Sequence, residues 1–141
     1  MTEHALEPTD GPHALDDLLD AARAVAVERG HTEVTTAHLL LALRGQVPGV
    51  APGALAEAVD RALATHTWWP FPVPPGEFPP LSRYAGEVHA RLLEGGPGPL
   101  AARVPLAVLE CELAGPGRLA LHALGLTTRR AHRELVSAAT G

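Results

Sequence analysis

The side chains of this chain that could do chemistry lack the spacing that catalytic and metal sites need. Eight histidines occur, but no HExxH pair or Cys-x-x-Cys motif accompanies them. The only serines, Ser82 and Ser137, lie outside a Gly-x-Ser-x-Gly elbow. Glu110 and Glu112 are two positions apart on an expected helix, hence on different faces, which does not suit an acid–base pair. The sequence therefore predicts no catalytic residue, no metal site, no cofactor and no enzyme activity.

The absence of lysine excludes further kinds of catalytic site. Without lysine the chain has no Schiff-base amine and no Gly-x-x-x-x-Gly-Lys-(Ser/Thr) phosphate loop, so we expect no ATPase module. The single cysteine, Cys111, excludes an internal disulfide and lies in an apolar stretch, where we interpret it as a small buried hydrophobe rather than a nucleophile. A reducing, cytoplasmic setting is the expectation.

Charge and hydropathy predict neither a nucleic-acid nor a membrane partner. The net charge is −5, with about −7 in residues 1–60 and +2 in the remainder, which is too mild for either surface. The start of the chain is acidic and broken by proline, unlike a signal peptide, and no apolar run approaches the roughly 20 residues of a membrane helix. A basic cluster at residues 129–133 could contact phosphates, but Ala131, Leu135 and Val136 favour the solvated face of a last helix.

Hydrophobic periodicity predicts an all-α fold. The first expected helix ends before Gly30, and Thr35 or Thr36 caps the second. The expected helices span about 13–29, 36–43 and 54–64 in the first half, then one beginning near 81 and ending before Gly95, one over 104–113, a short one with Leu119, Leu121 and Leu124, and a last one capped by Thr127 or Thr128 and running to about 138.

The two halves repeat each other in outline. The segment 34–45 is echoed about seventy residues later by 104–115, each between helical stretches and followed by a Gly/Pro break. We therefore predict one domain built as a tandem pseudo-two-fold repeat of three- to four-helix units. Its parts are a loose tail at 1–12, repeat 1 at 13–65, a Pro/aromatic linker at 66–80 and repeat 2 at 81–139.

The linker is the most unusual stretch of the sequence. Residues 66–81 hold six prolines and four of the five aromatic residues, which predicts an extended connector. Its rings either offer a surface to a partner or fold back over the seam between the repeats, and we expect packing for at least two of the four. The partner-binding candidates are Trp68, Trp69, Phe71, Phe78, Leu81 and Tyr84.

The second expected helix resembles a family motif. Thr36-Ala-His-Leu-Leu-Leu-Ala-Leu43 is similar to the Thr-Glu-His-(Leu/Ile)-Leu-Leu-(Gly/Ala)-Leu motif of the Clp N-terminal (Clp repeat) domain, found at the front of ClpA- and ClpC-type AAA+ unfoldases. The second copy, 106–113, keeps only the apolar skeleton, and the resemblance spans about 13–139. His38 is expected to bond a loop backbone from a half-buried edge. The structural motif residues are Thr36, His38, Leu39, Leu40 and Leu43.

The resemblance implies a non-catalytic protein- or peptide-binding module, an accessory or decoy for the Clp protease system that meets Clp machinery, its substrates or a Clp-directed small molecule. Ala37 and Ala107 stand where the ClpC-type motifs carry glutamates associated with phosphoarginine recognition, which implies that this site is lost. Leu81 and Gly86 replace an aromatic and a basic residue of the family. The alternative is a structural or regulatory interaction protein with no Clp link, whose specificity lies in the linker. The oligomeric state stays open.

Overall fold

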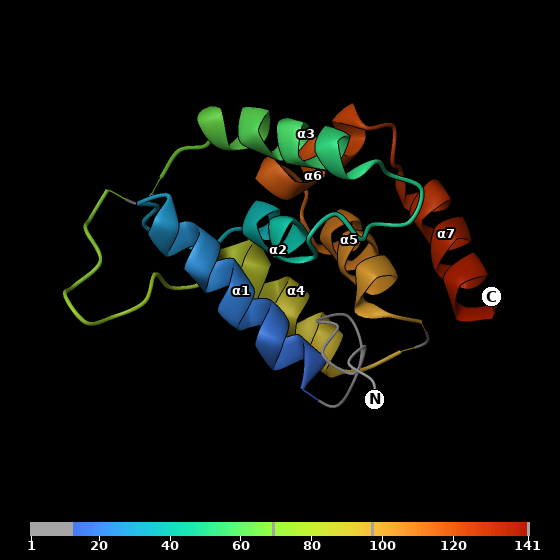
Figure 1. The fold of residues 1–141 in the computed structure, drawn as a ribbon, viewed down its shortest axis with the longest axis horizontal. Helices are drawn as coiled ribbons and strands as arrows, with labels where there is room; N and C mark the ends of the chain where they lie inside the picture. Colours follow the sequence, from blue (N-terminus) through green and yellow to red (C-terminus); the bar gives the residue numbers. More distant parts are fainter. Residues whose placement is uncertain (1–12, 69, 97, 141) are drawn as a thin grey trace.

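The computed structural model describes residues 13–68, 70–96 and 98–140, and the expected loose tail at 1–12 lies outside them. These residues form helices joined by loops, with one isolated parallel bridge between Val34 and Leu81. The helices are α1 (Ala14–Glu28), α2 (Thr36–Ala42), α3 (Pro52–Ala64), α4 (Arg83–Leu93), α5 (Leu100–Cys111), α6 (Pro116–Ala123) and α7 (Thr128–Thr140) (Figure 1).

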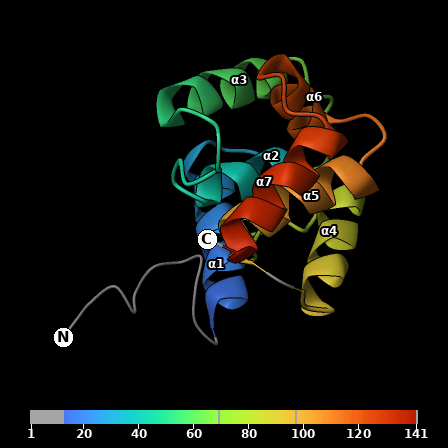
Figure 2. The same cartoon turned by 90° about the vertical axis from the view of Figure 1, so that its right-hand side faces the viewer.

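The helices stack in three layers that mirror the repeat in the sequence. Helices α3 and α6 lie together at the top of Figures 1 and 2, α2 and α5 lie beneath them, and α1 and α4 form the bottom. In the first half α1 packs on α2 and α2 on α3, and in the second α4 packs on α5 and α5 on α6. Contacts between α3 and α6 close the two halves on each other, and α7 crosses α5. The prediction of an all-α tandem fold is confirmed.

Helix α2 is the centre of this arrangement, and its sequence explains why it starts where it does. The Thr35 hydroxyl accepts a hydrogen bond from the Ala37 N–H at 3.2 Å, while the Thr35 N–H donates to Nδ1 of His38 at 2.8 Å. This is a capping box with histidine in place of the usual Glu or Gln. The helix is enclosed on nearly all sides. The motif residues Thr36, His38, Leu39, Leu40 and Leu43 are all fully buried.

The sequence placed His38 at a half-buried edge, and this was wrong. Its ring is fully buried, because α1, α3 and the start of the linker surround that end of α2. The expected bond to a loop backbone does exist, but the partner is the N–H of its own cap residue, Thr35.

Both ends of the expected fifth helix also need correction. Helix α5 begins at Leu100 rather than 104, because burial of Leu100, Ala101 and Ala102 offsets the backbone bond that Pro105 cannot make inside the helix. Helix α5 ends at Cys111, so residues 112 and 113 belong to the following turn.

The last two helices depart from their expected apolar stripes. In α6, Leu121 is buried as expected, but Leu119 is exposed. In α7, Ala131 is buried and Val136 is exposed, so the helix contacts α5 through a narrower strip than expected; the side chain of Leu135 lies outside the described residues. The arginines of the basic cluster lie on the solvated side, and Arg130 donates to the Gly49 carbonyl at 3.1 Å.

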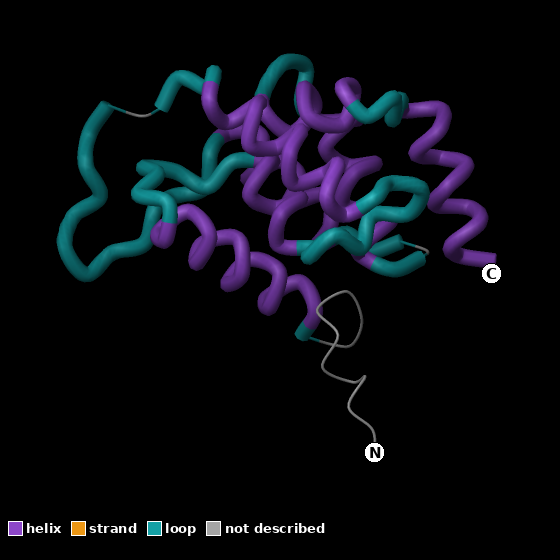
Figure 3. The backbone as a smooth tube through the Cα atoms, turned by 45° about the horizontal axis from the view of Figure 1, so that its top comes forward, coloured by secondary structure: helices purple, strands orange, loops and turns teal. Residues whose placement is uncertain are grey.

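The connection from α3 to α4 contains no helix and stands away from the bundle, as the views in Figures 1 and 3 both show. Its end is fixed to repeat 1 by two backbone bonds. The Val34 N–H donates to the Pro80 carbonyl, and the Ser82 N–H donates to the Val34 carbonyl, both at 2.8 Å. Ser82 then caps α4 by accepting from the Ala85 N–H. The linker therefore returns to the seam next to the start of α2.

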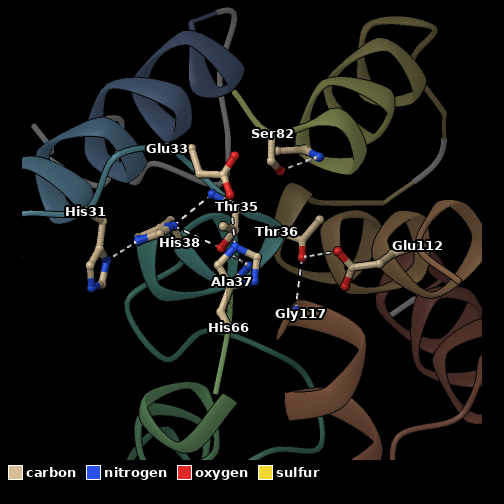
Figure 4. A network of polar contacts seen from close by, with 11 residues as sticks. His31, Glu33, Thr35, Thr36, Ala37, His38, His66, Ser82, Glu112 and Gly117 are labelled. Atoms are coloured by element: carbon tan, nitrogen blue, oxygen red, sulfur yellow. Dashed lines mark hydrogen bonds and ion pairs between the residues drawn. The ribbon is translucent and has the colours of Figure 1, made fainter. Parts of the chain in front are cut away.

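A buried polar cluster joins the two repeats, and we call it the seam node: Thr36, Glu112, Gly117 and Arg118 (Figure 4). The Thr36 hydroxyl donates to Oε2 of Glu112 at 2.8 Å and accepts from the Gly117 N–H at 3.0 Å. The other carboxylate oxygen, Oε1, accepts from the Arg118 N–H at 2.7 Å. Two first-turn N–H groups of α6 are thus satisfied by side chains outside that helix, one of them from the other repeat.

Two glycines make room for the seam node. A Cβ at position 115 would lie 2.5 Å from the carboxylate of Glu112, and one at position 117 would lie 2.7 Å from Cβ of Thr36. At either position an added side chain would force its neighbour to move, and at 115 this would displace the bonded Glu112 carboxylate. The Gly-Pro-Gly break is therefore required by the close contact of α6 with α2 and with the end of α5.

We predict that Thr36→Val, which keeps the shape of the side chain but removes its hydroxyl, destabilises the protein by about 2–3 kcal/mol. The substitution leaves the Gly117 N–H and one buried carboxylate oxygen of Glu112 without a partner. Urea unfolding followed by circular dichroism measures the loss. Thr67→Val, on the exposed linker, is the control and is expected to change the free energy of unfolding by less than about 0.5 kcal/mol. Equal effects of the two substitutions would contradict the role of the seam node.

Two glycine-to-alanine substitutions give a second test of the seam node, because they are expected to change stability in opposite directions. Gly117→Ala should destabilise by about 1–3 kcal/mol, because the added methyl overlaps the β-branched Thr36 side chain. Gly86→Ala, inside α4 with nothing within 4 Å of the new methyl, should stabilise by about 0.5–1 kcal/mol. Thermal unfolding of both variants checks the pair. A neutral or stabilising Gly117→Ala would show that α6 is not held tightly against α2.

Candidate functional site

A groove of about 770 Å³ opens at the seam, directly outside the seam node. Its walls come from the end of α3, the segment before α2, the start of α4, the α5–α6 turn and the exposed side of α6. Both repeats therefore contribute to it. The volume lies within the range of pockets that hold small ligands or a short piece of a larger partner.

The groove carries apolar side chains that the core does not use. Leu113 is 78% exposed and Leu119 is 54% exposed, and Tyr84 at the start of α4 lines the groove with them. Leu113 is held outward because the chain turns at Glu112 to place the Glu112 carboxylate under the start of α6. Exposed leucines gathered in a concavity mark interaction surfaces more often than isolated ones do.

A cluster of rings lies beside the groove and anchors the linker. Trp68 stacks on His31 with ring centroids 4.0 Å apart, and His66 meets Trp68 edge-on at 4.6 Å. His31 Nδ1 lies 2.9 Å from Nε2 of His38, and Nε2 of His66 lies 2.9 Å from a carboxylate oxygen of Glu33 (Figure 4). Glu33 and His66 also line the groove. Through these contacts the first residues of the linker are bound to repeat 1.

Hydrogen bonding assigns the proton positions in this cluster. Nδ1 of His38 accepts the Thr35 N–H, so its proton sits on Nε2 and is donated to Nδ1 of His31. A second proton on His38 would displace the Thr35 N–H. Burial, with smaller contributions from His31, Arg29 and His66, lowers the pKa of His38 to about 3, and burial followed by Arg29 and His66 also lowers the pKa of His31. The folded protein therefore favours neutral rings at both positions.

The remaining reactive side chains show no catalytic arrangement among the described residues. No group of three or more His, Cys, Asp or Glu side chains is placed to hold a metal ion in that part of the chain. Cys111 is half-buried, and burial, opposed by Arg91, raises the pKa of its thiol, which keeps it from being a ready nucleophile. Within the same residues, no helix has the length and apolar character to cross a membrane.

The structure separates the partner-binding candidates. Tyr84 lines the groove, whereas Trp68 is half-buried against the core. Phe71 and Phe78 are exposed on the linker, and Leu81 is half-buried and packed on the core beside Val34. Trp69 lies outside the described residues. Of the three described linker rings, Trp68 packs on the core and Phe71 and Phe78 are exposed, so the expectation that at least two of the four rings pack stays a prediction.

The groove residues Leu113, Leu119 and Glu112 were missed as site residues. The sequence assigned Leu119 to an apolar stripe and Glu112 to a helix face. The available signal was the Gly-Pro-Gly that follows, since such a start to a helix has no capping side chain of its own and needs an acceptor from elsewhere. An acid three residues before Gly115 can supply that acceptor.

The lowered pKa of His38 predicts a pH-dependent stability. Unfolding returns His38 to its ordinary pKa of 6.5, so the unfolded chain binds a proton that the folded protein refuses until about pH 3. The free energy of unfolding is therefore expected to fall as the pH drops from about 6.5 to about 3. His38→Gln keeps a capping-box acceptor but cannot titrate, and its stability should fall less steeply, by up to about 1.4 kcal/mol per pH unit.

Urea unfolding at a series of pH values between 7 and 4 measures both slopes. His13→Gln, at the exposed start of α1, is the control for removing a histidine elsewhere. Parallel curves for the wild type and His38→Gln would contradict the assignment of a buried neutral ring.

A comparison with known protein families finds a match for the first repeat. Residues 13–63 match the family model of the Clp repeat (R) N-terminal domain, a span that covers α1, α2 and nearly all of α3. No curated protein matches the chain. The match confirms the resemblance seen in the motif at 36–43. Residues 13–63 are therefore similar to a Clp repeat N-terminal domain, and the second half of the chain lies outside the matched span.

Proposed function

We propose that the chain acts without catalysis as an accessory of the Clp proteolytic system and holds a short segment of a partner protein in the seam groove. The match of the first repeat to the Clp repeat N-terminal domain supports a Clp-related protein-interaction module. The observation that carries the finer proposal is the groove itself, which both repeats build and in which Leu113 and Leu119 are exposed. Apolar anchors in a concave site contribute most of the affinity in such interfaces.

The groove replaces the recognition site that the family motif would suggest. Ala37 and Ala107 are both buried, so neither motif position presents a side chain to a partner. No carboxylate stands at these positions to pair with a modified arginine. Recognition therefore depends on side chains that lie outside the motif, on the α5–α6 turn and on α6.

The link to the Clp system takes one of two forms under this proposal. The chain either delivers substrates or adaptors to the unfoldase, or it acts as a decoy that binds a ligand in the place of the unfoldase domain. Both forms need only binding and both are expected in the cytoplasm. Recovery of Clp subunits on the immobilised protein from native lysate supports the first form, and loss of that recovery on groove substitution connects it to the seam.

Leu119→Glu tests the groove directly. It places a charge among the apolar groove side chains and should weaken binding of selected peptides by more than about tenfold, a change of about 1.4 kcal/mol, with little effect on stability because the side chain is exposed. Leu93→Glu is the matched control, since Leu93 is 65% exposed at the end of α4 and lies outside the groove. Fluorescence polarisation with peptides selected by display measures affinity, and circular dichroism checks folding.

The linker gives a second candidate surface. Phe71 and Phe78 are exposed on a loop that stands away from the helices (Figure 3), as expected for an interaction protein whose specificity lies in the linker. A Phe71→Ala/Phe78→Ala variant separates the two candidates. If it abolishes partner binding while Leu119→Glu leaves binding intact, the groove proposal is wrong and the linker surface is the site.

A further inference from the structure

We infer that the seam groove selects acidic segments: its partner is an extended stretch of protein in which an apolar side chain is flanked by aspartate or glutamate. The inference rests on the proposed function, because it assigns the class of segment to the same groove. It follows from the difference between two sets of charged groove side chains: those that already form bonds within the fold and those that are exposed to solvent.

The carboxylates that line the described groove are both used internally. Glu33 is paired with His66 at 2.9 Å, and both side chains are mostly buried. Glu112 is buried in the seam node, where its two oxygens accept from the Thr36 hydroxyl and the Arg118 N–H. Neither acid can meet a partner's arginine or lysine without breaking a bond that holds the fold. A basic segment would therefore find no available counter-charge.

The side chains of the groove that can donate hydrogen bonds to an acid are more accessible. The side chain of Arg83, at the start of α4, is 82% exposed, and its ion pair with Glu87 is a solvent-exposed contact of 3.4 Å within one helix. Such exposed pairs contribute little and exchange readily with a better partner. His122 is exposed on α6, one turn from Leu119. Arg118 donates to the carbonyls of Leu109 and Glu112, so it adds positive charge to the wall while it closes the end of α5.

The backbone at the start of α4 adds to the positive potential of the groove. Helix α4 begins at the groove with Arg83 as its first residue, so its positive dipole end lies there, whereas the first-turn N–H groups of α6 are already bonded to Glu112 and Thr36. The protein as a whole carries a net charge of −5. The charge that the groove exposes is thus positive, at Arg83, while both of its carboxylates are held in internal bonds, an arrangement that favours an acidic segment over a basic one.

The size and the apolar lining of the groove indicate how long the bound segment is and which side chain it needs besides its acids. Leu113, Leu119 and Tyr84 provide apolar surface in the same groove as Arg83 and His122. A bound segment would place one apolar side chain on this surface and its acids toward the Arg83 guanidinium and the ring N–H of His122. The volume of about 770 Å³ suits a short extended stretch rather than a folded domain.

The test uses two display pools of short random peptides, one built from Leu, Phe, Gly, Asp and Glu and the other from Leu, Phe, Gly, Lys and Arg. We expect enrichment from the acidic pool. Synthesised winners should bind the wild type in fluorescence polarisation, with affinity that falls as salt is raised. Arg83→Glu should weaken them by about tenfold or more. Arg61→Glu is the matched control, because Arg61 is 75% exposed and has the same kind of i,i+4 pair, with Glu57, outside the groove.

The outcomes separate this inference from the proposed function. Enrichment of basic peptides whose binding is lost in Leu119→Glu would overturn the selection for acids and leave the groove as the binding site. Acidic peptides that bind Arg83→Glu and Arg61→Glu equally well would also overturn it. No enrichment from either pool would overturn both the inference and the proposed function. Circular dichroism of each variant checks whether it is still folded, so that a loss of peptide binding can be told from a loss of structure.

Discussion

The hydroxyl of Thr36 is the point at which the two halves of this protein become one structure. It donates to a buried carboxylate and accepts a first-turn N–H of α6, so a side chain of repeat 1 completes a helix of repeat 2. A Cβ at position 115 would meet the Glu112 carboxylate and one at position 117 would meet the Thr36 side chain, so both glycines allow this close approach. Polar bonds in a buried seam fix one geometry more narrowly than apolar contact alone, since an unpaired partner there is costly.

The groove is a consequence of this constraint. Turning the chain at Glu112 to cap α6 leaves Leu113 outside the core, and the angle at which α6 meets α3 leaves Leu119 beside it. The ring cluster of His31, Trp68 and His66 then holds the linker to the adjacent wall. The chain, which has Ala37 and Ala107 at the two motif positions, thus presents a concave, partly apolar surface at the junction of its repeats.

Much of repeat 1 could be predicted from the sequence because its signals are local. The 3.6-residue spacing of the leucines at 39, 40 and 43, the capping threonine and the terminating Gly30 all act within one or two turns. The bond between Glu112 and Thr36 could not be predicted, because the two residues are 76 positions apart. The stack of Trp68 on His31 is equally nonlocal. The start of α5 was predicted too late in the sequence, because a proline normally lies in the first turn of a helix, whereas Pro105 lies inside this one. Helix periodicity reports which face is apolar, but it does not say which leucine a turn will leave exposed.

Native-state hydrogen exchange at the amides of Gly117 and Arg118 tests the central claim most directly. These N–H groups occupy the first turn of α6, where amides normally exchange fast because no helical carbonyl accepts them. If the seam node joins the repeats, both should exchange only through global unfolding, as slowly as the amides in the middle of α2. Exchange at the rate of a fraying helix end, with the core of α2 still protected, would contradict the account.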